Sequence, residues 1–196
     1  VLRHALGDPA PDTVVYEEPD ALYRAFLYRS RDRKILFVGS ASSTTTEMHW
    51  IPTDAPTDAP TCILPREEGH EYYADHRDDL FYLRTNKGAV NFRLVAAPVS
   101  DPTPDHWSEV IPHDPDTMLE EHDLFAGHLV VTELSGGLPR LRVLSFATGG
   151  EHLVTFPEPT YTAGLEVNRE WDTSVLRFRY ASLITPPSVY AYDMDT

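Results

Sequence analysis

HEYYADHRDDLFYLRTNKGAVNFRLVAAP, residues 70–98, contains three short runs rich in aromatic and aliphatic residues, divided by polar segments. The runs are His70–Ala74, Leu80–Arg84 and Asn91–Val95, and the turn-forming residues Asn86-Lys87-Gly88 separate the last two. Their length and aromatic content are typical of strands, and the residues between them are typical of a hairpin turn. No window of the chain has a sustained 3.6-residue apolar periodicity, so the sequence predicts an all-β protein.

The same pattern recurs along the chain at a nearly constant spacing. Apolar runs begin at residues 35, 80, 129 and 175, and a second strand follows each run, centred at residues 48, 92, 141 and 189. Each repeat also has a strand before and a strand after this central pair, as at Ser108–Ile111 in the second repeat. A period of about 40–50 residues with strands only is the signature of β-propeller blades.

This repeat sets the expected domain organisation, a partial β-propeller of four-stranded antiparallel blades over residues 1–196. The chain begins and stops within a blade, so we expect an open ring that is part of a larger one. A β-sandwich is the structural alternative, because it also has short strands at regular spacing. The expected blade units are residues 1–18 (partial), 21–66, 70–113, 117–158 and 162–196 (incomplete).

The charge balance restricts the partners. Asp and Glu outnumber Lys and Arg by 31 to 16, which gives a formal charge of −15. This argues against nucleic acid and anionic membranes, since both need a positive field. It suits a cationic ligand, although acidity also serves solubility alone. The chain has no apolar run of about 18 residues, and the single Cys62 excludes an internal disulfide framework.

The sequence contains no recognisable catalytic motif. The nucleophile elbow G-x-S-x-G is missing, and Gly39–Ser43 shares only its composition, in a predicted hairpin without a following helix. No P-loop and no G-x-G-x-x-G occurs. We therefore predict no catalytic residue and no cofactor within this chain.

The nine histidines do not form a metal-ligand pattern. His70 and His76 lack the i, i+4 spacing of a zinc helix. On a strand they would lie on one face, about 20 Å apart at about 3.3 Å per residue, which is too far for one metal ion. We predict no metal site.

Short motifs are spread over nearly the whole chain. Those of the second repeat follow the order HEY, DH, FY, RTN and NFRL. Together the motifs resemble the oligopeptidase B branch of the prolyl oligopeptidase family. The residues that carry the resemblance are His70-Glu71-Tyr72, Asp75-His76, Phe81-Tyr82, Arg84-Thr85-Asn86, Asn91–Leu94, Trp107, Ile111–His113, Ser135–Leu138, Leu141–Val143, Phe156–Pro159, Tyr161-Thr162, Arg177, Tyr180, Ser182-Leu183, Pro186, Val189-Tyr190 and Tyr192–Met194.

The resemblance implies a two-domain serine peptidase. A seven-bladed propeller, of which this chain would supply about four blades, covers an α/β-hydrolase domain with a Ser-Asp-His triad. Such enzymes cleave short peptides after Lys or Arg, and the propeller restricts access to small substrates. The catalytic domain follows the propeller, so no triad residue is placed in this chain. The implied location is the cytoplasm, with the periplasm as the alternative. TDAPTDAP, residues 53–60, departs from the pattern and is interpreted as a loop insertion.

In propellers of this type the first strand of each blade lines the central tunnel. We hypothesise that carboxylates on these strands steer cationic peptides inward by their field. The competing interpretation is that they are solvated edges, or salt-bridge partners of the hydrolase domain. The candidates are Glu71, Asp75, Glu120, Glu121, Asp123, Glu166 and Glu170.

Two other classes of function remain open at this stage. One is a free-standing propeller that binds protein partners, and the other is a metal-dependent or lyase-type propeller enzyme. The first would lack a downstream hydrolase domain, and the second would need clustered ligands that the sequence does not contain. If made alone, the chain would expose unpaired strand edges, so we expect self-association.

Overall fold

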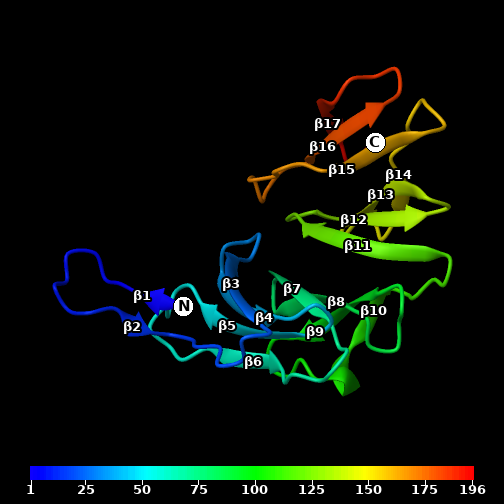
Figure 1. The fold of residues 1–196 in the computed structure, drawn as a ribbon. Helices are drawn as coiled ribbons and strands as arrows, with labels where there is room; N and C mark the ends of the chain where they lie inside the picture. The colour runs from blue at the N-terminus through cyan, green and yellow to red at the C-terminus, as the bar shows by residue number, and fades with distance from the viewer. The chain divides into compact units, whose positions relative to one another are not determined.

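Nearly all regular structure in residues 1–196, which the computed structural model describes, is β-strand (Figure 1). The single helical element is the 3-10 helix η1 (Pro104–His106), and no helix is long and apolar enough to cross a membrane. The strands are β1 (Leu2–Arg3), β2 (Thr13–Val14), β3 (Arg24–Arg29), β4 (Ile35–Ala41), β5 (Thr46–Pro52), β6 (Thr61–Leu64), β7 (Tyr72–Arg77), β8 (Leu80–Thr85), β9 (Arg93–Pro98), β10 (Ser108–Ile111), β11 (Thr117–Leu124), β12 (His128–Ser135), β13 (Leu138–Ser145), β14 (Glu151–Leu153), β15 (Tyr161–Leu165), β16 (Val175–Ser182) and β17 (Ser188–Asp193).

These strands form five sheets in which neighbours in sequence are neighbours in space. A two-stranded sheet (β1-β2) precedes three four-stranded sheets, β3 to β6, β7 to β10 and β11 to β14, and a three-stranded sheet, β15 to β17, ends the chain. The sequence-based prediction of an all-β chain of four-stranded antiparallel sheets is confirmed. The chain divides into two compact units, which are described separately: unit 1 (residues 1–87 and 96–108) and unit 2 (residues 88–95 and 109–196).

In unit 1, β4 is apolar on both faces because it is an inner strand of a covered sheet. Phe37 and Val38 are fully buried side by side on opposite faces. Gly39 pairs with Phe26 of β3, and the Phe26 ring lies over it. A Cβ atom at residue 39 would stand 2.1 Å from that ring, so this position of β4 requires glycine.

Tyr72 links β7 to the preceding sheet of unit 1. The pairing of β5 with β6 is interrupted by a bulge between Met48 and His49. The buried Tyr72 hydroxyl reaches this interruption, where it accepts from the Met48 amide at 2.8 Å and donates to the Leu64 carbonyl at 2.7 Å. At the other end of the residue, the Tyr72 amide donates to Thr46 Oγ1 at 2.7 Å. One side chain therefore satisfies backbone groups that the bulge leaves without a strand partner.

In unit 2, the sheet of β11 to β14 packs against the sheet of β15 to β17. Buried residues alternate along β16, where Leu176, Phe178 and Tyr180 face the core, and Arg177 and Arg179 face outward. This period of two is the pattern of a strand with one covered face. The core is an apolar cluster formed by Phe125, Val130, Leu141, Val143, Val154, Leu176, Phe178, Tyr180 and Met194.

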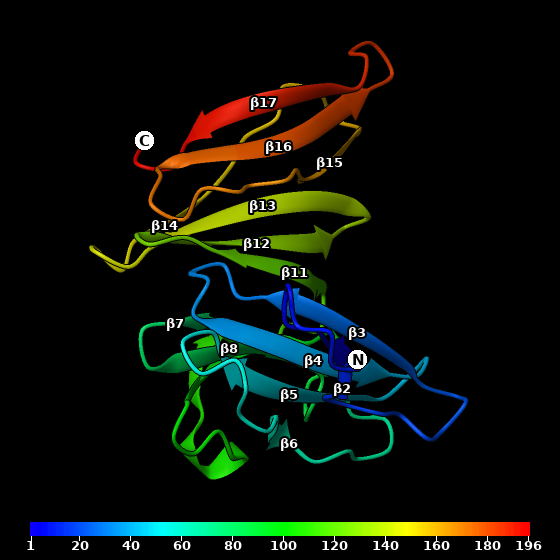
Figure 2. The same ribbon diagram turned by 90° about the vertical axis from the view of Figure 1, so that its left-hand side faces the viewer.

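The connections of unit 2 lie at two ends of its sheets, since its strands run antiparallel (Figure 2). The crossover end contains the connections between sheets, residues 112–116 and 154–160, and the turns at residues 136–137 and 183–187. The opposite end contains the loops at residues 125–127, 146–150 and 166–174. The Ala126 amide donates to the Trp171 carbonyl at 2.9 Å, so loops of both sheets meet at the opposite end.

Several strand boundaries differ from those expected. β7 begins at Tyr72 instead of His70, and β9 begins at Arg93 instead of Asn91. Phe92 has a left-handed backbone, with φ of 63°, which excludes it from a regular strand. After β14 ends at Leu153, the chain turns inward and places the Phe156 ring on Tyr180, with ring centroids 5.1 Å apart.

Candidate functional site

The acidic candidates Glu166 and Glu170 lie together at the opposite end of unit 2. They line an open hollow of about 950 Å³ beside the β15–β16 loop. The other lining residues are Val167, Asn168, Arg169, Thr173, Val175, Arg177, Val189, Tyr190 and Ala191. The wall thus combines carboxylates, guanidinium groups and apolar side chains.

Asn168 fixes the shape of this hollow. Its side chain is buried, and its Oδ1 accepts from the Arg177 amide at 2.7 Å. Its Nδ2 donates to the carbonyls of Glu166 at 2.8 Å and Arg177 at 3.1 Å. The side-chain amide therefore forms hydrogen bonds with the β16 backbone like those of a paired strand residue. These bonds hold residues 166–170 against the sheet beyond the end of β15.

Glu166 is engaged by a neighbouring strand. Its Oε2 lies 3.1 Å from Arg179 Nε on β16, and its Oε1 accepts from the Val167 amide at 3.1 Å. Arg179 is mostly exposed, so this ion pair is worth little to stability. Its effect is to neutralise part of the negative charge at this wall.

A bulge repositions the three candidates on β11. The register shifts between Leu119 and Glu121, so Leu119 opposes Glu133 while Glu121 opposes Thr132. Glu120 is the extra residue. Regular alternation would place Leu119, Glu121 and Asp123 on one face, but the bulge puts Glu121 and Asp123 on the face opposite to Leu119. This is the face that carries Val130 into the core between the two sheets of unit 2.

The two candidates in unit 1 have local structural contacts. Asp75 is only 8% exposed, and its Oδ1 accepts from the amides of Arg31 at 3.0 Å and His76 at 2.8 Å. Glu71 precedes β7, and its backbone exchanges hydrogen bonds with Asn86. Asp75 thus holds the β3–β4 turn to β7.

The histidines singled out in the sequence are part of the same framework. His76 Nδ1 lies 2.7 Å from Asp32 Oδ2, and both side chains are buried. His70 Nε2 lies 2.8 Å from Thr85 Oγ1, and burial lowers the pKa of His70. No group of three or more His, Cys, Asp or Glu residues in the chain is placed to hold a metal ion.

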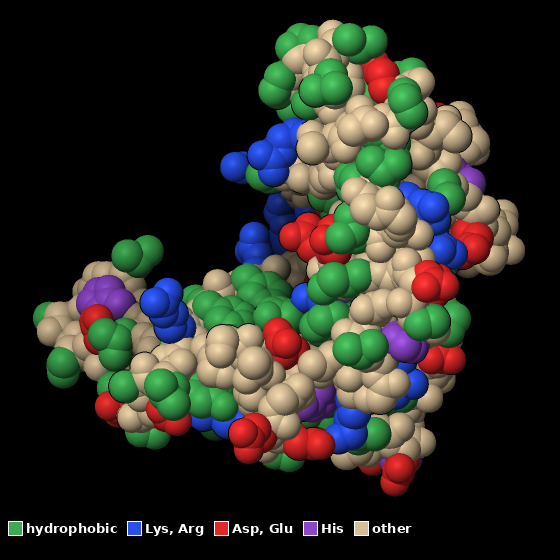
Figure 3. Space-filling view, turned by 45° about the vertical axis from the view of Figure 1, so that its right-hand side comes forward, with side chains coloured by type: hydrophobic (Ala, Val, Ile, Leu, Met, Phe, Trp, Pro, Cys, Tyr) green, Lys and Arg blue, Asp and Glu red, His purple; other side chains and the backbone are tan.

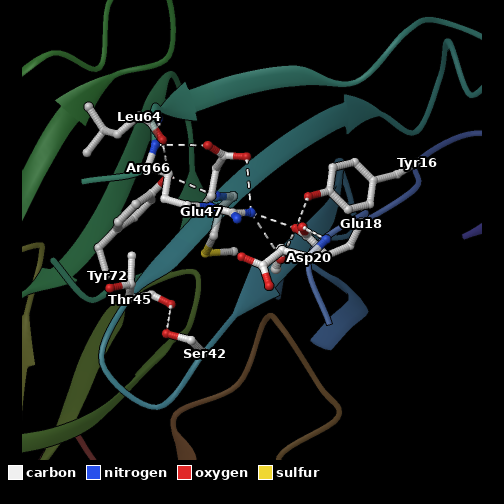
Figure 4. A network of polar contacts seen from close by, with 11 residues as sticks. Tyr16, Glu18, Asp20, Ser42, Thr45, Glu47, Leu64, Arg66 and Tyr72 are labelled. Carbon is white, nitrogen blue, oxygen red and sulfur yellow. Dashed lines mark hydrogen bonds and ion pairs between the residues drawn. The ribbon is translucent and has the colours of Figure 1, made fainter. Parts of the chain in front are cut away.

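A polar network of unit 1 around Glu18 and Arg66 was not predicted from the sequence (Figure 4). The Glu18 carboxylate is 6% exposed and accepts from Arg66 Nη2 at 2.6 Å, Ser40 Oγ at 2.5 Å and the Tyr16 hydroxyl at 3.0 Å. The Arg66 guanidinium also stacks on the Tyr23 ring at 3.7 Å. The network fastens the segment before β3 to β4 and to the end of β6.

Arg66 sets the charge state of this network. Its hydrogen bond is the main reason that the pKa of Glu18 falls from 4.5 to about 2, while burial acts in the opposite direction. Residues 18, 40 and 66 are far apart in the sequence, and none belongs to a motif. No sequence signal could have identified this group.

Acidic side chains do not form one continuous patch on the visible face of either unit. Figure 3 shows Asp and Glu interspersed with Lys, Arg and hydrophobic side chains. The chain as a whole carries a formal charge of −15, and Glu166 and Glu170 are the acidic candidates that line a hollow.

Comparison with known proteins gives consistent results for the whole chain. Residues 1–196 match the family described as prolyl oligopeptidase, N-terminal β-propeller domain. The chain is 37% identical to dipeptidyl aminopeptidase BI of Pseudoxanthomonas mexicana, over 100% of this chain and 27% of that protein. It is 30% identical to protease 2 of Moraxella lacunata, over 99% of this chain and 28% of that protein.

Among solved structures, oligopeptidase B from Trypanosoma brucei superposes with a TM-score of 0.92 and 30% identity, over 100% of this chain and 29% of that one. Oligopeptidase B from Leishmania major gives a TM-score of 0.90 at 28% identity, over 99% of this chain and 29% of that one. The chain therefore spans less than a third of the length of these relatives.

Proposed function

Because the chain belongs to the N-terminal β-propeller domain of the prolyl oligopeptidase family, we propose that it is the non-catalytic, substrate-gating part of a serine oligopeptidase. The family match over residues 1–196 is the observation that carries this proposal. The sheets make up about four blades of a seven-bladed ring that is completed elsewhere in the polypeptide. The partner is a C-terminal α/β-hydrolase domain of the same polypeptide, located in the cytoplasm.

The substrates of the complete polypeptide are short peptides cleaved after Lys or Arg. The names of the relatives support peptidase chemistry, and the oligopeptidase B structures are close in fold. The formal charge of −15 favours the approach of cationic peptides and disfavours acidic ones. The propeller restricts the access of substrates to the catalytic site, and the catalytic residues lie outside residues 1–196.

The decisive assay compares the complete polypeptide with residues 1–196 alone, on a short fluorogenic peptide ending in Arg-Arg. We expect cleavage by the complete polypeptide only, and its loss after treatment with a serine-reactive phosphonate. Absence of cleavage by both would refute the gating role and favour a free-standing binding propeller. A matched peptide ending in Glu-Glu separates Lys/Arg preference from general peptidase activity.

Within this function, we propose that carboxylates of the first strands and their loops steer cationic peptides. Glu121, Asp123, Glu166 and Glu170 are the better candidates, because Asp75 is buried in hydrogen bonds to backbone amides. Steering by a field raises the association rate and weakens as salt is added. The combined variant Glu121→Gln, Asp123→Asn, Glu166→Gln and Glu170→Gln should lower kcat/KM for the Arg-Arg peptide and flatten its salt dependence.

The control is a variant with the same charge change at exposed carboxylates of unit 1 that are not candidates, Glu17→Gln, Asp54→Asn, Asp58→Asn and Glu68→Gln. If both variants change the salt dependence equally, only the total charge matters. If neither does, carboxylate steering is wrong while the gating role is unaffected.

The chain made alone should also self-associate. β17 is the last strand of an incomplete sheet, so one edge of that sheet has backbone groups without a strand partner. Solution scattering at several concentrations should give a mass above that of one chain. A concentration-independent monomer would refute this.

A further inference from the structure

The connection between β10 and β11 borders a small pocket at the crossover end of unit 2. Its volume is about 230 Å³, and all of its lining residues belong to unit 2. Pockets for whole drug-sized ligands are about 300–1,000 Å³, so this pocket suits a single side chain or a terminal group. The lining residues are Phe92, Ile111, Pro112, His113, Asp114, Thr117, Leu119, Glu133 and Arg142.

The backbone around the pocket is tied in place, and one residue of it is strained. Asn91 Nδ2 donates to the carbonyls of Asp114 at 3.2 Å and Pro115 at 2.7 Å. The Asn91 carbonyl accepts from the Leu119 amide at 2.9 Å, so the connection is bound to the segment before β9. Phe92 is buried with a left-handed backbone. Such conformations of bulky residues persist only where the surrounding structure enforces them, and they concentrate at functional sites.

The charged groups in and beside the pocket wall are mainly acidic. The Glu133 carboxylate is 2% exposed and accepts from Arg142 Nη2 at 3.2 Å, while Arg142 Nη1 donates to Glu151 Oε1 at 3.0 Å. Two carboxylates therefore share one guanidinium group. A hydrogen bond from the Asp116 amide lowers the pKa of Asp114, so Asp114 is ionised at neutral pH. Three carboxylates against one guanidinium give a formal charge of −2, which disfavours an anion in this pocket.

His113 has a hydrogen-bonding atom that the protein does not use. Its Nε2 is buried and has no hydrogen-bond partner. A buried polar atom in this state costs free energy, which a ligand group in the pocket recovers when it forms the missing bond. A neutral imidazole has one acceptor nitrogen, so His113 is able to accept from an N–H group of a ligand.

We propose that this pocket binds one positively charged nitrogen group of a peptide, with Asp114 and His113 as acceptors and Phe92 as the aromatic part of the wall. The inference rests on the proposed function, because that function supplies the peptide. Carboxylates and aromatic rings both attract ammonium and guanidinium groups. Two parts of a peptide carry such a group, the amino terminus and the side chain of Lys or Arg.

The test uses the complete polypeptide and peptides with the sequence Ala-Ala-Arg before a fluorogenic group. In one pair the amino terminus is free or acetylated. In a second pair, acetylated throughout, the peptide begins with an added Lys or an added norleucine. The KM of the cationic member should be about fivefold lower than that of its neutral partner in at least one pair, and that pair identifies the source of the bound group. Equal KM values within both pairs would overturn the inference.

Variants locate the effect in the pocket. Asp114→Asn and His113→Leu should each bring the KM ratio of the responding pair toward one. Asp116→Asn is the matched control, because Asp116 is an exposed carboxylate of the same connection outside the pocket lining, and the ratio should stay unchanged. Equal reduction by Asp114→Asn and Asp116→Asn would refute the pocket, since the total charge alone would then explain the preference.

The ratio within a pair also separates binding from folding, because a misfolded variant loses activity toward the neutral peptides as well. If the complete polypeptide cleaves none of the peptides, the proposed function fails. Calorimetric titration with the same peptides then still measures the ratio of their dissociation constants. Failure of the proposed function and failure of the pocket are therefore distinguishable.

Discussion

Replacing Glu18 by Gln tests the main polar network of unit 1. The substitution keeps the size of the side chain but removes the charge that Arg66 and Ser40 bind at 2.6 and 2.5 Å. The pKa of Glu18 falls from 4.5 to about 2 on folding, and each pKa unit corresponds to about 1.4 kcal/mol. The full shift would be worth roughly 3 kcal/mol, and since Arg66 is partly exposed we expect a loss of about 2 kcal/mol.

The assay is hydrogen exchange of the complete polypeptide, read at the amides of residues 16–18, 20–23, 40–42, 64 and 66. A loss of about 2 kcal/mol corresponds to exchange about thirtyfold faster where local opening governs the rate. Glu17→Gln is the matched control, because Glu17 is exposed and precedes the network by one residue.

The pH dependence of this difference has a definite sign. The folded-state pKa of Glu18 is lowered, so its contribution is fully present above pH 4.5 and is lost as the pH falls through about 2. The original chain and the Glu18→Gln variant should therefore converge in exchange rate toward the acid end of this range. The reasoning fails if the two chains already exchange equally at pH 7, or if Glu17→Gln has the same effect.

Three further outcomes follow from unit 1. Tyr72→Phe leaves the Met48 amide and the Leu64 carbonyl without their side-chain partner; we expect a loss of about 2 kcal/mol, visible as faster exchange of the Met48 amide. Gly39→Ala drives a Cβ atom into the Phe26 ring; a loss of about 1–3 kcal/mol in urea denaturation should be relieved when Phe26→Ala is added. Burial lowers the pKa of His70 below 6.5, so its neutral form is favoured in the fold; stability should decrease as the pH falls below 6.5, and His70→Asn should reduce this slope in thermal melts.

The strands could be predicted where a local pattern decides them. The run at Leu80–Arg84 lies within β8, and the glycines at 136 and 137 both have positive φ in the two-residue turn that joins β12 to β13. Repetition of these local signals was sufficient to predict sheets of four antiparallel strands. The predicted start of β9 was wrong because Phe92 has a left-handed backbone. Its residue type gives no sign of this conformation, since aromatic residues are typical of strands.

The candidate site was less accessible to prediction. Glu166 and Glu170 line one hollow because the side chain of Asn168 forms hydrogen bonds that hold their loop against β16. The sequence gives no sign that an asparagine in a loop forms hydrogen bonds with a neighbouring strand. Asp75 was grouped with the tunnel-lining carboxylates, and its burial could not be predicted because its contact with the Arg31 amide links residues 44 positions apart. Tertiary contacts of this kind are invisible to composition and spacing.

The extra residue at Glu120 has an evolutionary consequence. Since two residues of β11 share one position of its partner, loss of the codon for Glu120 would leave a regular ladder in which Leu119 still opposes Glu133 and Glu121 still opposes Thr132. Every side chain from residue 121 to residue 124 would keep its partner and its side of the sheet, because Glu121 would then follow Leu119 directly and alternate with it. Insertion or deletion at this site is therefore a change through which related proteins can gain or lose one carboxylate without moving Glu121 and Asp123 to the other face.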